Sequence, residues 1–149
     1  MPAVICDTSC LIFLGRMNKL RLLPDLFGQV WLTAAVAAEY RLALPAWAVV
    51  QAVVEPAPAL VPTRLGAGER SAIGLALAHP GCLLIIDDEQ PKQLAKALGI
   101  ACIGTLGILS LAKEAGLIPL LRPAVEDVRA AGMWLSDAVA ERVCRAAGE

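Results

Sequence analysis

Two apolar runs in this sequence end abruptly on carboxylates. Val4-Ile5-Cys6 precedes Asp7-Thr8-Ser9, and Leu83-Leu84-Ile85-Ile86 precedes Asp87-Asp88. If both runs are strands of one parallel sheet, the acids that follow them gather at one edge of that sheet. Clustered carboxylates repel one another and take up protons unless a cation lies between them. Mg²⁺ and Mn²⁺ prefer oxygen ligands, so the pattern points to a divalent-metal site.

Two further acids, Glu39 and Glu69, lie in predicted helices. Glu39 is the only acid in its helix, and its neighbours there are mostly small or apolar. Glu69 lies in a first helical turn, where an acid also interacts favourably with the helix dipole. Asp7 and one member of Asp87-Asp88 could equally cap the helices that follow them. Each acid alone therefore has a structural explanation, whereas all of them together favour a metal site.

The surrounding sequence alternates apolar runs of strand length with segments of helical period. We expect strands at residues 3–6, 30–32, 82–86 and 100–103. We expect helices at residues 8–14, 18–27, 33–44, 69–78, 89–98, 105–116, 122–131 and 136–147, the third of which ends at Pro45. Residues 46–62 read as a short helix followed by an extended segment. This alternation predicts an α/β fold, a three-layer α/β/α sandwich around a central, mostly parallel sheet.

Length and composition limit the class of protein. The 149 residues suit a single domain, 1–149, whose C-terminal helices at about 118–149 pack on the sheet or form an interface. The chain is 58% hydrophobic, yet no run approaches the roughly 18 to 20 apolar residues of a membrane span. Its N-terminus lacks the pattern of a signal peptide. We therefore expect a cytoplasmic protein with no membrane contact, whose excess apolar surface, for example at residues 46–62, is covered by a partner.

Charge and cysteine usage add two expectations. The five cysteines form no C-x-x-C pair and mostly lie in apolar runs, which predicts buried, reduced thiols. The formal net charge is −1, so nothing in the overall composition indicates nucleic acid. A site for a polyanion would need local cations or a metal.

The order of the acids resembles that of the PIN domain family, and the resemblance covers nearly the whole chain. In that family an Asp followed by Thr or Ser ends the first strand, as Asp7 does here, and a Glu follows the second strand, as Glu39 does. A third acid opens the helix before the next buried strand, matching Glu69, and a fourth follows that strand, matching Asp88 or Asp87. Residues 86–107 and 130–137 are similar to a bacterial and archaeal branch of PIN-like proteins related to VapC-type toxin ribonucleases.

This chain departs from the family pattern at two places. Its third acid is Glu69 rather than the commoner Asp, which adds one methylene to the reach of the carboxylate. Pro91-Lys92 stands where relatives often carry Arg. The lysine keeps the positive charge but lacks the planar guanidinium that can donate two hydrogen bonds to one phosphate.

The resemblance implies a metal-dependent endoribonuclease, often the toxin of a toxin–antitoxin pair, with an antitoxin partner and a homodimeric assembly. The carboxylates that would act in catalysis and hold one or two Mg²⁺ or Mn²⁺ ions are Asp7, Glu39, Glu69 and Asp88, with Asp87 as a further candidate ligand. Hydroxyls that could orient water or a ligand carboxylate are those of Thr8, Ser9 and Thr105. The candidate phosphate contacts are Arg64, Arg70, Lys92 and Lys96, of which Lys92 is the best.

Two alternatives remain open from the sequence. A PIN-like binding or regulatory module with vestigial acids would fold without cleaving RNA. In a receiver-like or phosphatase-like domain, a strand-end aspartate would instead become phosphorylated and the neighbouring acids would bind Mg²⁺. The phosphatase pattern needs an acid two residues after Asp7, where this chain has Ser9, and Ile103-Gly104-Thr105 lacks the late lysine of receiver domains.

Overall fold

A five-stranded parallel sheet forms the centre of the protein. The computed structural model describes residues 2–149. The strands are β1 (Val4–Cys6), β2 (Val30–Thr33), β3 (Ala48–Gln51), β4 (Leu83–Ile85) and β5 (Ala101–Ile103), in the order β3-β2-β1-β4-β5. β1 pairs in parallel with β2 on one side and with β4 on the other. The predicted α/β architecture is confirmed, and β1 and β4, the strands that end on acids, are neighbours at its centre.

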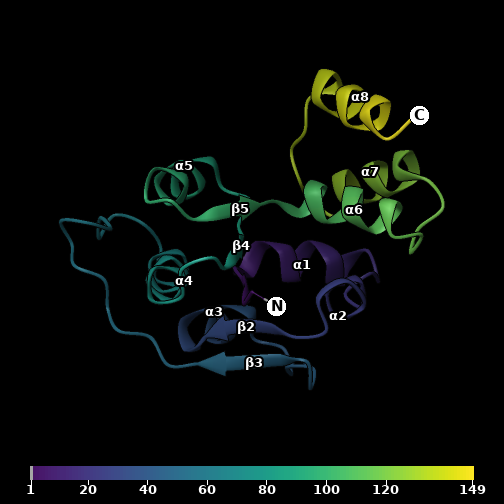
Figure 1. The fold of residues 1–149 in the computed structure, drawn as a ribbon. Helices are drawn as coiled ribbons and strands as arrows, with labels where there is room; N and C mark the ends of the chain where they lie inside the picture. Colours follow the sequence, from purple (N-terminus) through teal and green to yellow (C-terminus); the bar gives the residue numbers. More distant parts are fainter. Residues whose placement is uncertain (1) are drawn as a thin grey trace.

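Eight helices of the described chain flank this sheet (Figure 1). They are α1 (Thr8–Arg16), α2 (Leu22–Phe27), α3 (Ala34–Tyr40), α4 (Ala67–Ala78), α5 (Glu89–Ala97), α6 (Thr105–Glu114), α7 (Leu121–Ala130) and α8 (Asp137–Ala146). In Figure 1, α4 and α5 lie on one side of the strands and α1, α2 and α6 on the other, with α7 and α8 beyond α6. None of the helices within residues 2–149 is long and apolar enough to cross a membrane.

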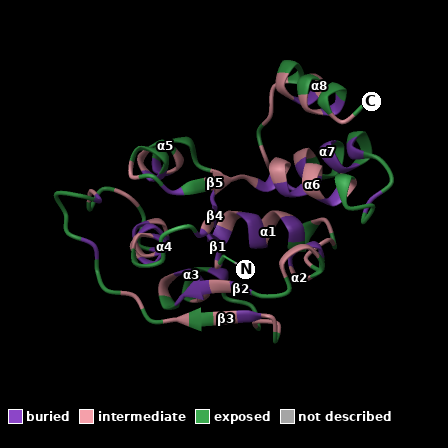
Figure 2. Cartoon of the chain, in the orientation of Figure 1, coloured by how far each residue is buried: buried purple, intermediate pink, exposed green. Residues whose placement is uncertain are grey.

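Side chains of the central strands alternate between two cores, one on each face of the sheet, and Figure 2 marks the buried residues along the chain. Val4, Cys6 and Ile85 pack into the core beneath α1, α2 and α6. Ile5 and Leu84 point the other way, into the core beneath α4 and α5. Burial on both faces explains why these strands are continuously apolar in sequence.

The thiols lie as the sequence predicts. Cys6, Cys10, Cys82 and Cys144 are buried, Cys102 is half-buried, and all five are free.

The region between β2 and α4 differs from the sequence prediction. The helix expected to reach residue 44 ends at Tyr40, because Arg41 adopts a left-handed conformation with φ 62°. The short helix expected after Pro45 is instead β3, which pairs along its whole length with β2, from Ala48 opposite Val30 onward. Tertiary pairing with an existing strand outweighs the weak local preference of this alanine- and valine-rich stretch. Residues 52–66 then run as an irregular excursion to α4 (Figure 1).

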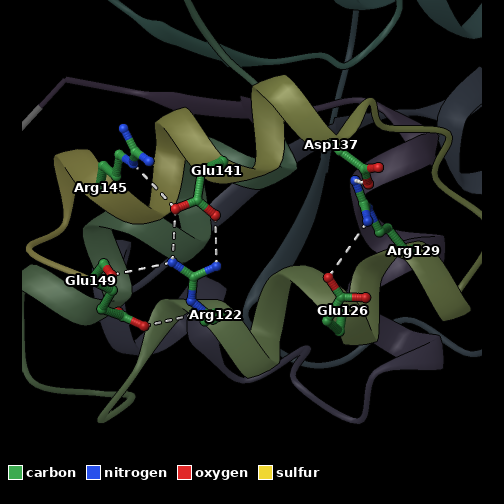
Figure 3. Close-up of polar contacts among 7 residues, drawn as sticks. All are labelled: Arg122, Glu126, Arg129, Asp137, Glu141, Arg145 and Glu149. Atoms are coloured by element: carbon green, nitrogen blue, oxygen red, sulfur yellow. Dashed lines mark hydrogen bonds and ion pairs between the residues drawn. The ribbon is translucent and has the colours of Figure 1, made fainter.

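Ion pairs link the C-terminal helices α7 and α8, as Figure 3 shows. The guanidinium of Arg122 in α7 contacts Glu141 in α8 at 2.8 Å, and Arg129 contacts Asp137 at 3.0 Å. Glu149 accepts hydrogen bonds from the backbone N–H groups of residues 121 and 122, which open α7 without a side-chain cap of their own. Buried residues of α7 and α8 belong to the same core as β1.

Candidate metal centre

Asp7 lies at the junction of β1 and α1 and is only 3% exposed. Its backbone N–H donates to the carbonyl of Ile85 at 2.9 Å, which extends the pairing of β1 with β4. Although Asp7 occupies the N-cap position of α1, its side chain makes no capping hydrogen bond. Its Oδ1 is buried without any hydrogen-bond partner among residues 2–149. A simple capping role therefore does not explain this aspartate.

The electrostatic surroundings of Asp7 raise its pKa from 3.8 to about 7. Burial is the largest cause, because it removes water from the charged form. The negative charges of Glu69, Glu39 and Asp88 raise the pKa further, and a hydrogen bond from the backbone of Thr8 partly opposes the shift. All four predicted catalytic carboxylates are thus close enough to interact.

Glu39 is held in place by two donors from other elements. The hydroxyl of Thr8 donates to its Oε2 at 2.8 Å, and the backbone N–H of Gly68 donates to its Oε1 at 3.0 Å. A Cβ atom on residue 68 would lie 2.6 Å from Oε2, so glycine is what lets α4 approach this carboxylate. Gly68 is a site residue that its sequence pattern does not single out, although the glycine-rich stretch Gly66-Ala67-Gly68 marks the start of α4.

Glu69 and Asp88 complete the cluster from α4 and from the start of α5. Glu69 accepts a hydrogen bond from the N–H of Gly66 at 3.1 Å. Its pKa is raised by burial, by a side-chain hydrogen bond with Asp88, and by the charges of Asp88 and Glu39. Asp88 is exposed and, as N-cap of α5, makes no side-chain capping bond, so its carboxylate is available at the edge of the sheet.

Asp87 has a different environment from Asp88. Its two carboxylate oxygens accept hydrogen bonds of 2.7 Å from the backbone N–H and from the hydroxyl of Thr105, at the first turn of α6. Thr105 is fully buried. A Cβ on Gly104 would lie 3.0 Å from Asp87 Oδ1 and 3.1 Å from Lys92 Nζ, so the ammonium lies beside this pair. Asp87 therefore joins the end of β4 to the start of α6.

The predicted phosphate contacts separate into two groups. Arg70 is buried, and its guanidinium donates to the carbonyls of Pro56, Val61 and Pro62 and pairs with Glu55. These bonds tie the 52–66 segment to α4 and leave Arg70 no free face for a phosphate, which corrects the expectation from sequence. By contrast Lys92 is half-buried near Asp87, while Arg64 and Lys96 are exposed. Ser9 is half-buried in the first turn of α1.

The chemistry of these donors suits a hard divalent cation. The cluster supplies carboxylate oxygens and includes a buried oxygen without a partner. Within residues 2–149 no three acidic, cysteine or histidine side chains already converge as a ready-made ligand set. Glu39 and Glu69 accept backbone N–H groups, which offset only part of the repulsion among the acids. Binding of one ion by this set would require the carboxylates to come closer together.

Comparison with known families agrees with this arrangement. A family model described as a PIN domain, DUF3368, matches residues 3–149. The chain belongs to the PIN domain family. PIN domains are typically nucleases and generally bind Mg²⁺. Neither the curated proteins nor the solved structures contain a significant match to this PIN domain.

Proposed function

We propose that this PIN domain is a metal-dependent endoribonuclease that hydrolyses RNA phosphodiester bonds. The observation that carries the proposal is Asp7, a buried acid with an oxygen that lacks a partner and with three further carboxylates acting on its charge. Such an arrangement disfavours ionisation in the metal-free protein and is relieved by a divalent cation.

The roles of the acids follow from their environments. Asp7, Glu39, Glu69 and Asp88 would hold Mg²⁺ or Mn²⁺, because all four carboxylates interact at one edge of the sheet. The bound ion would supply the positive charge that activates water and stabilises the pentacovalent phosphate. Residues outside the ligand set position it, as Thr8 does when its hydroxyl holds Glu39.

We assign the fourth ligand to Asp88 rather than Asp87. Both oxygens of Asp87 are engaged by Thr105, whereas the charge of Asp88 acts directly on Asp7 and Glu69. Asp87 then serves as a positioning residue that holds α6 against the end of β4. Lys92, next to Asp87, is the cation best placed to contact a phosphate of the RNA.

Cleavage of a pool of structured and single-stranded RNA tests the proposal. Wild type, Asp7→Asn and the matched control Asp127→Asn, an exposed acid of α7, are incubated with Mn²⁺, with Mg²⁺ or with EDTA. We expect cleavage by wild type and by the control that needs metal, and a loss of at least about a hundredfold in Asp7→Asn. Equal activity in all three would indicate a contaminating nuclease. Metal binding without cleavage would favour a binding or regulatory module.

A toxin role is a further part of the proposal and rests on the family alone. In that role the protein arrests growth when expressed, is neutralised by a cognate antitoxin, and acts in the cytoplasm as a homodimer. Leu42 and Trp134, which are 67% and 88% exposed, are apolar positions that a partner could cover. Growth arrest by wild type and not by Asp7→Asn, together with a dimeric mass in light scattering, would support this role. A harmless wild type that cleaves RNA in vitro would refute it.

A further inference from the structure

A hollow of about 380 Å³ adjoins the carboxylate cluster on the side of α5. Glu69 and Asp88 form the wall that it shares with the cluster. Arg64 and Leu65 line it from the segment before α4, and the first turn of α5 lines it from the opposite side. Its volume lies within the range of roughly 300–1,000 Å³ that is usual for small-ligand sites. A group bound there would lie beside two of the proposed metal ligands.

The lining of the hollow contains both apolar side chains and side chains that can form hydrogen bonds. Leu65 is half-buried and Pro91 is largely covered, and both contribute apolar atoms to the lining, against which a flat ring could pack. Glu89 and Gln90 are exposed polar residues in the same wall. Glu89 Oε1 accepts one hydrogen bond from Gln93 at 3.1 Å, which orients a carboxylate that retains further acceptor capacity. Such a lining suits a nucleobase better than a second phosphate.

Charge argues in the same direction. Three carboxylates line the hollow, and because Glu69 and Asp88 are assigned to the metal, Glu89 is the one left to accept from a ligand, opposite the guanidinium of Arg64. Arg64 forms no ion pair with any residue of the described range, so its planar group is available to stack on a base. A free carboxylate selects a base with two adjacent donors. Guanine has two, N1–H and the N2 amino group, which match the two oxygens of one carboxylate.

We propose that this hollow is a base-recognition subsite that takes a guanine next to the scissile phosphate, with Glu89 accepting from its Watson–Crick edge and Arg64 stacking on its face. The inference rests on the proposed nuclease function, since it names the RNA that the same site prefers.

Mapping of cleavage sites in a randomised RNA pool tests the preference. With Mn²⁺, wild type is expected to cleave beside guanine about tenfold more often than beside other bases, because one hydrogen bond to a charged group changes binding by about that factor. Replacing that guanine by hypoxanthine, which lacks the N2 amino group, should remove most of the preference. Glu89→Gln and Arg64→Ala should reduce the ratio between guanine and the other bases. The matched controls Glu114→Gln and Arg142→Ala, both exposed and remote from the hollow, should retain it.

A binding measurement separates failure of this inference from failure of the nuclease proposal. Metal-free protein labelled with ¹⁵N is titrated with guanosine, inosine and adenosine. We expect guanosine to shift the amide signals of residues 88–90 at lower concentration than the other two nucleosides do, and Glu89→Gln to abolish the difference. If no RNA is cleaved but guanosine binds selectively, the subsite stands and the nuclease proposal falls. Cleavage without base preference, a preference that survives Glu89→Gln, or equal binding of the three nucleosides would each overturn the subsite.

Discussion

The hydroxyl of Thr8 donates a 2.8 Å hydrogen bond to the carboxylate of Glu39, a residue 31 positions further along the chain. Thr8 is the first residue of α1, directly after Asp7, and Glu39 lies in the last turn of α3. This bond therefore fixes one proposed ligand relative to another and joins two helices at the edge of the sheet.

Removing the Thr8 hydroxyl should weaken metal binding more than folding. In Thr8→Val the side chain keeps its shape but no longer orients Glu39, so we expect the affinity for Mn²⁺ in isothermal titration calorimetry to fall about 10-fold to 100-fold. Thr8→Ser retains the hydroxyl and should bind Mn²⁺ nearly as wild type does. Equal affinity of wild type and Thr8→Val would show that Glu39 does not need this bond.

The metal-free protein should become less stable as pH rises toward 8. The unfolded chain ionises Asp7 near its ordinary pKa of 3.8, whereas the folded protein holds the proton up to a pKa of about 7. The folded state therefore binds more protons between these values, and its stability decreases as pH rises through that window. Asp7 alone should lower the free energy of unfolding by about 2 kcal/mol between about pH 5.5 and about pH 8, and Glu69 adds in the same direction.

Urea denaturation in EDTA at the two pH values measures this change. Asp7→Asn cannot ionise at this position, so its stability should depend less on pH and should equal or exceed that of wild type near pH 8. A marked loss of metal-free stability in Asp7→Asn at that pH would instead indicate that Asp7 acts as a helix cap.

Asp87 and Asp88 should give opposite results when each is changed. Asp87→Ala leaves the N–H and hydroxyl of Thr105 without their acceptor, so we expect a loss of about 1–2 kcal/mol in metal-free stability. The rise in melting temperature on adding Mn²⁺ should persist. Asp88→Asn should keep the metal-free stability and lose most of that rise. Thermal unfolding with and without Mn²⁺ distinguishes the two, and the reverse pattern would make Asp87 the ligand.

Arg70 should contribute to stability and not to RNA affinity. Arg70→Met removes the hydrogen bonds to the carbonyls of residues 56, 61 and 62, and several of these bonds are buried. We therefore expect the free energy of unfolding to fall by about 2–4 kcal/mol. Limited proteolysis should cut the 52–66 segment faster than in wild type. The exposed Arg142→Met serves as a control. A normally stable Arg70→Met with weakened RNA binding would restore Arg70 as a phosphate contact.

Much of the fold and part of the site could be predicted from local sequence. Continuous apolar runs predicted β1 and β4, because strands buried on both faces need apolar residues at every position. β3 was missed, since its four residues become a strand only by pairing with β2. The end of α3 was placed too late, because a left-handed residue at Arg41 leaves no trace in helical periodicity.

For the site itself, the sequence alone determined which acids follow the central strands, and the parallel arrangement then brings Asp7 and Asp88 to one edge. Only the tertiary structure decided which of two consecutive residues faces the site and which one packs elsewhere. Consecutive side chains point in different directions. Asp87 accepts from Thr105 at the start of α6, whereas Asp88 contacts Glu69. Likewise Arg70 binds the 52–66 segment, whereas Glu69 faces the site. Such choices depend on which helix packs against each side chain, and that information is not local to the sequence.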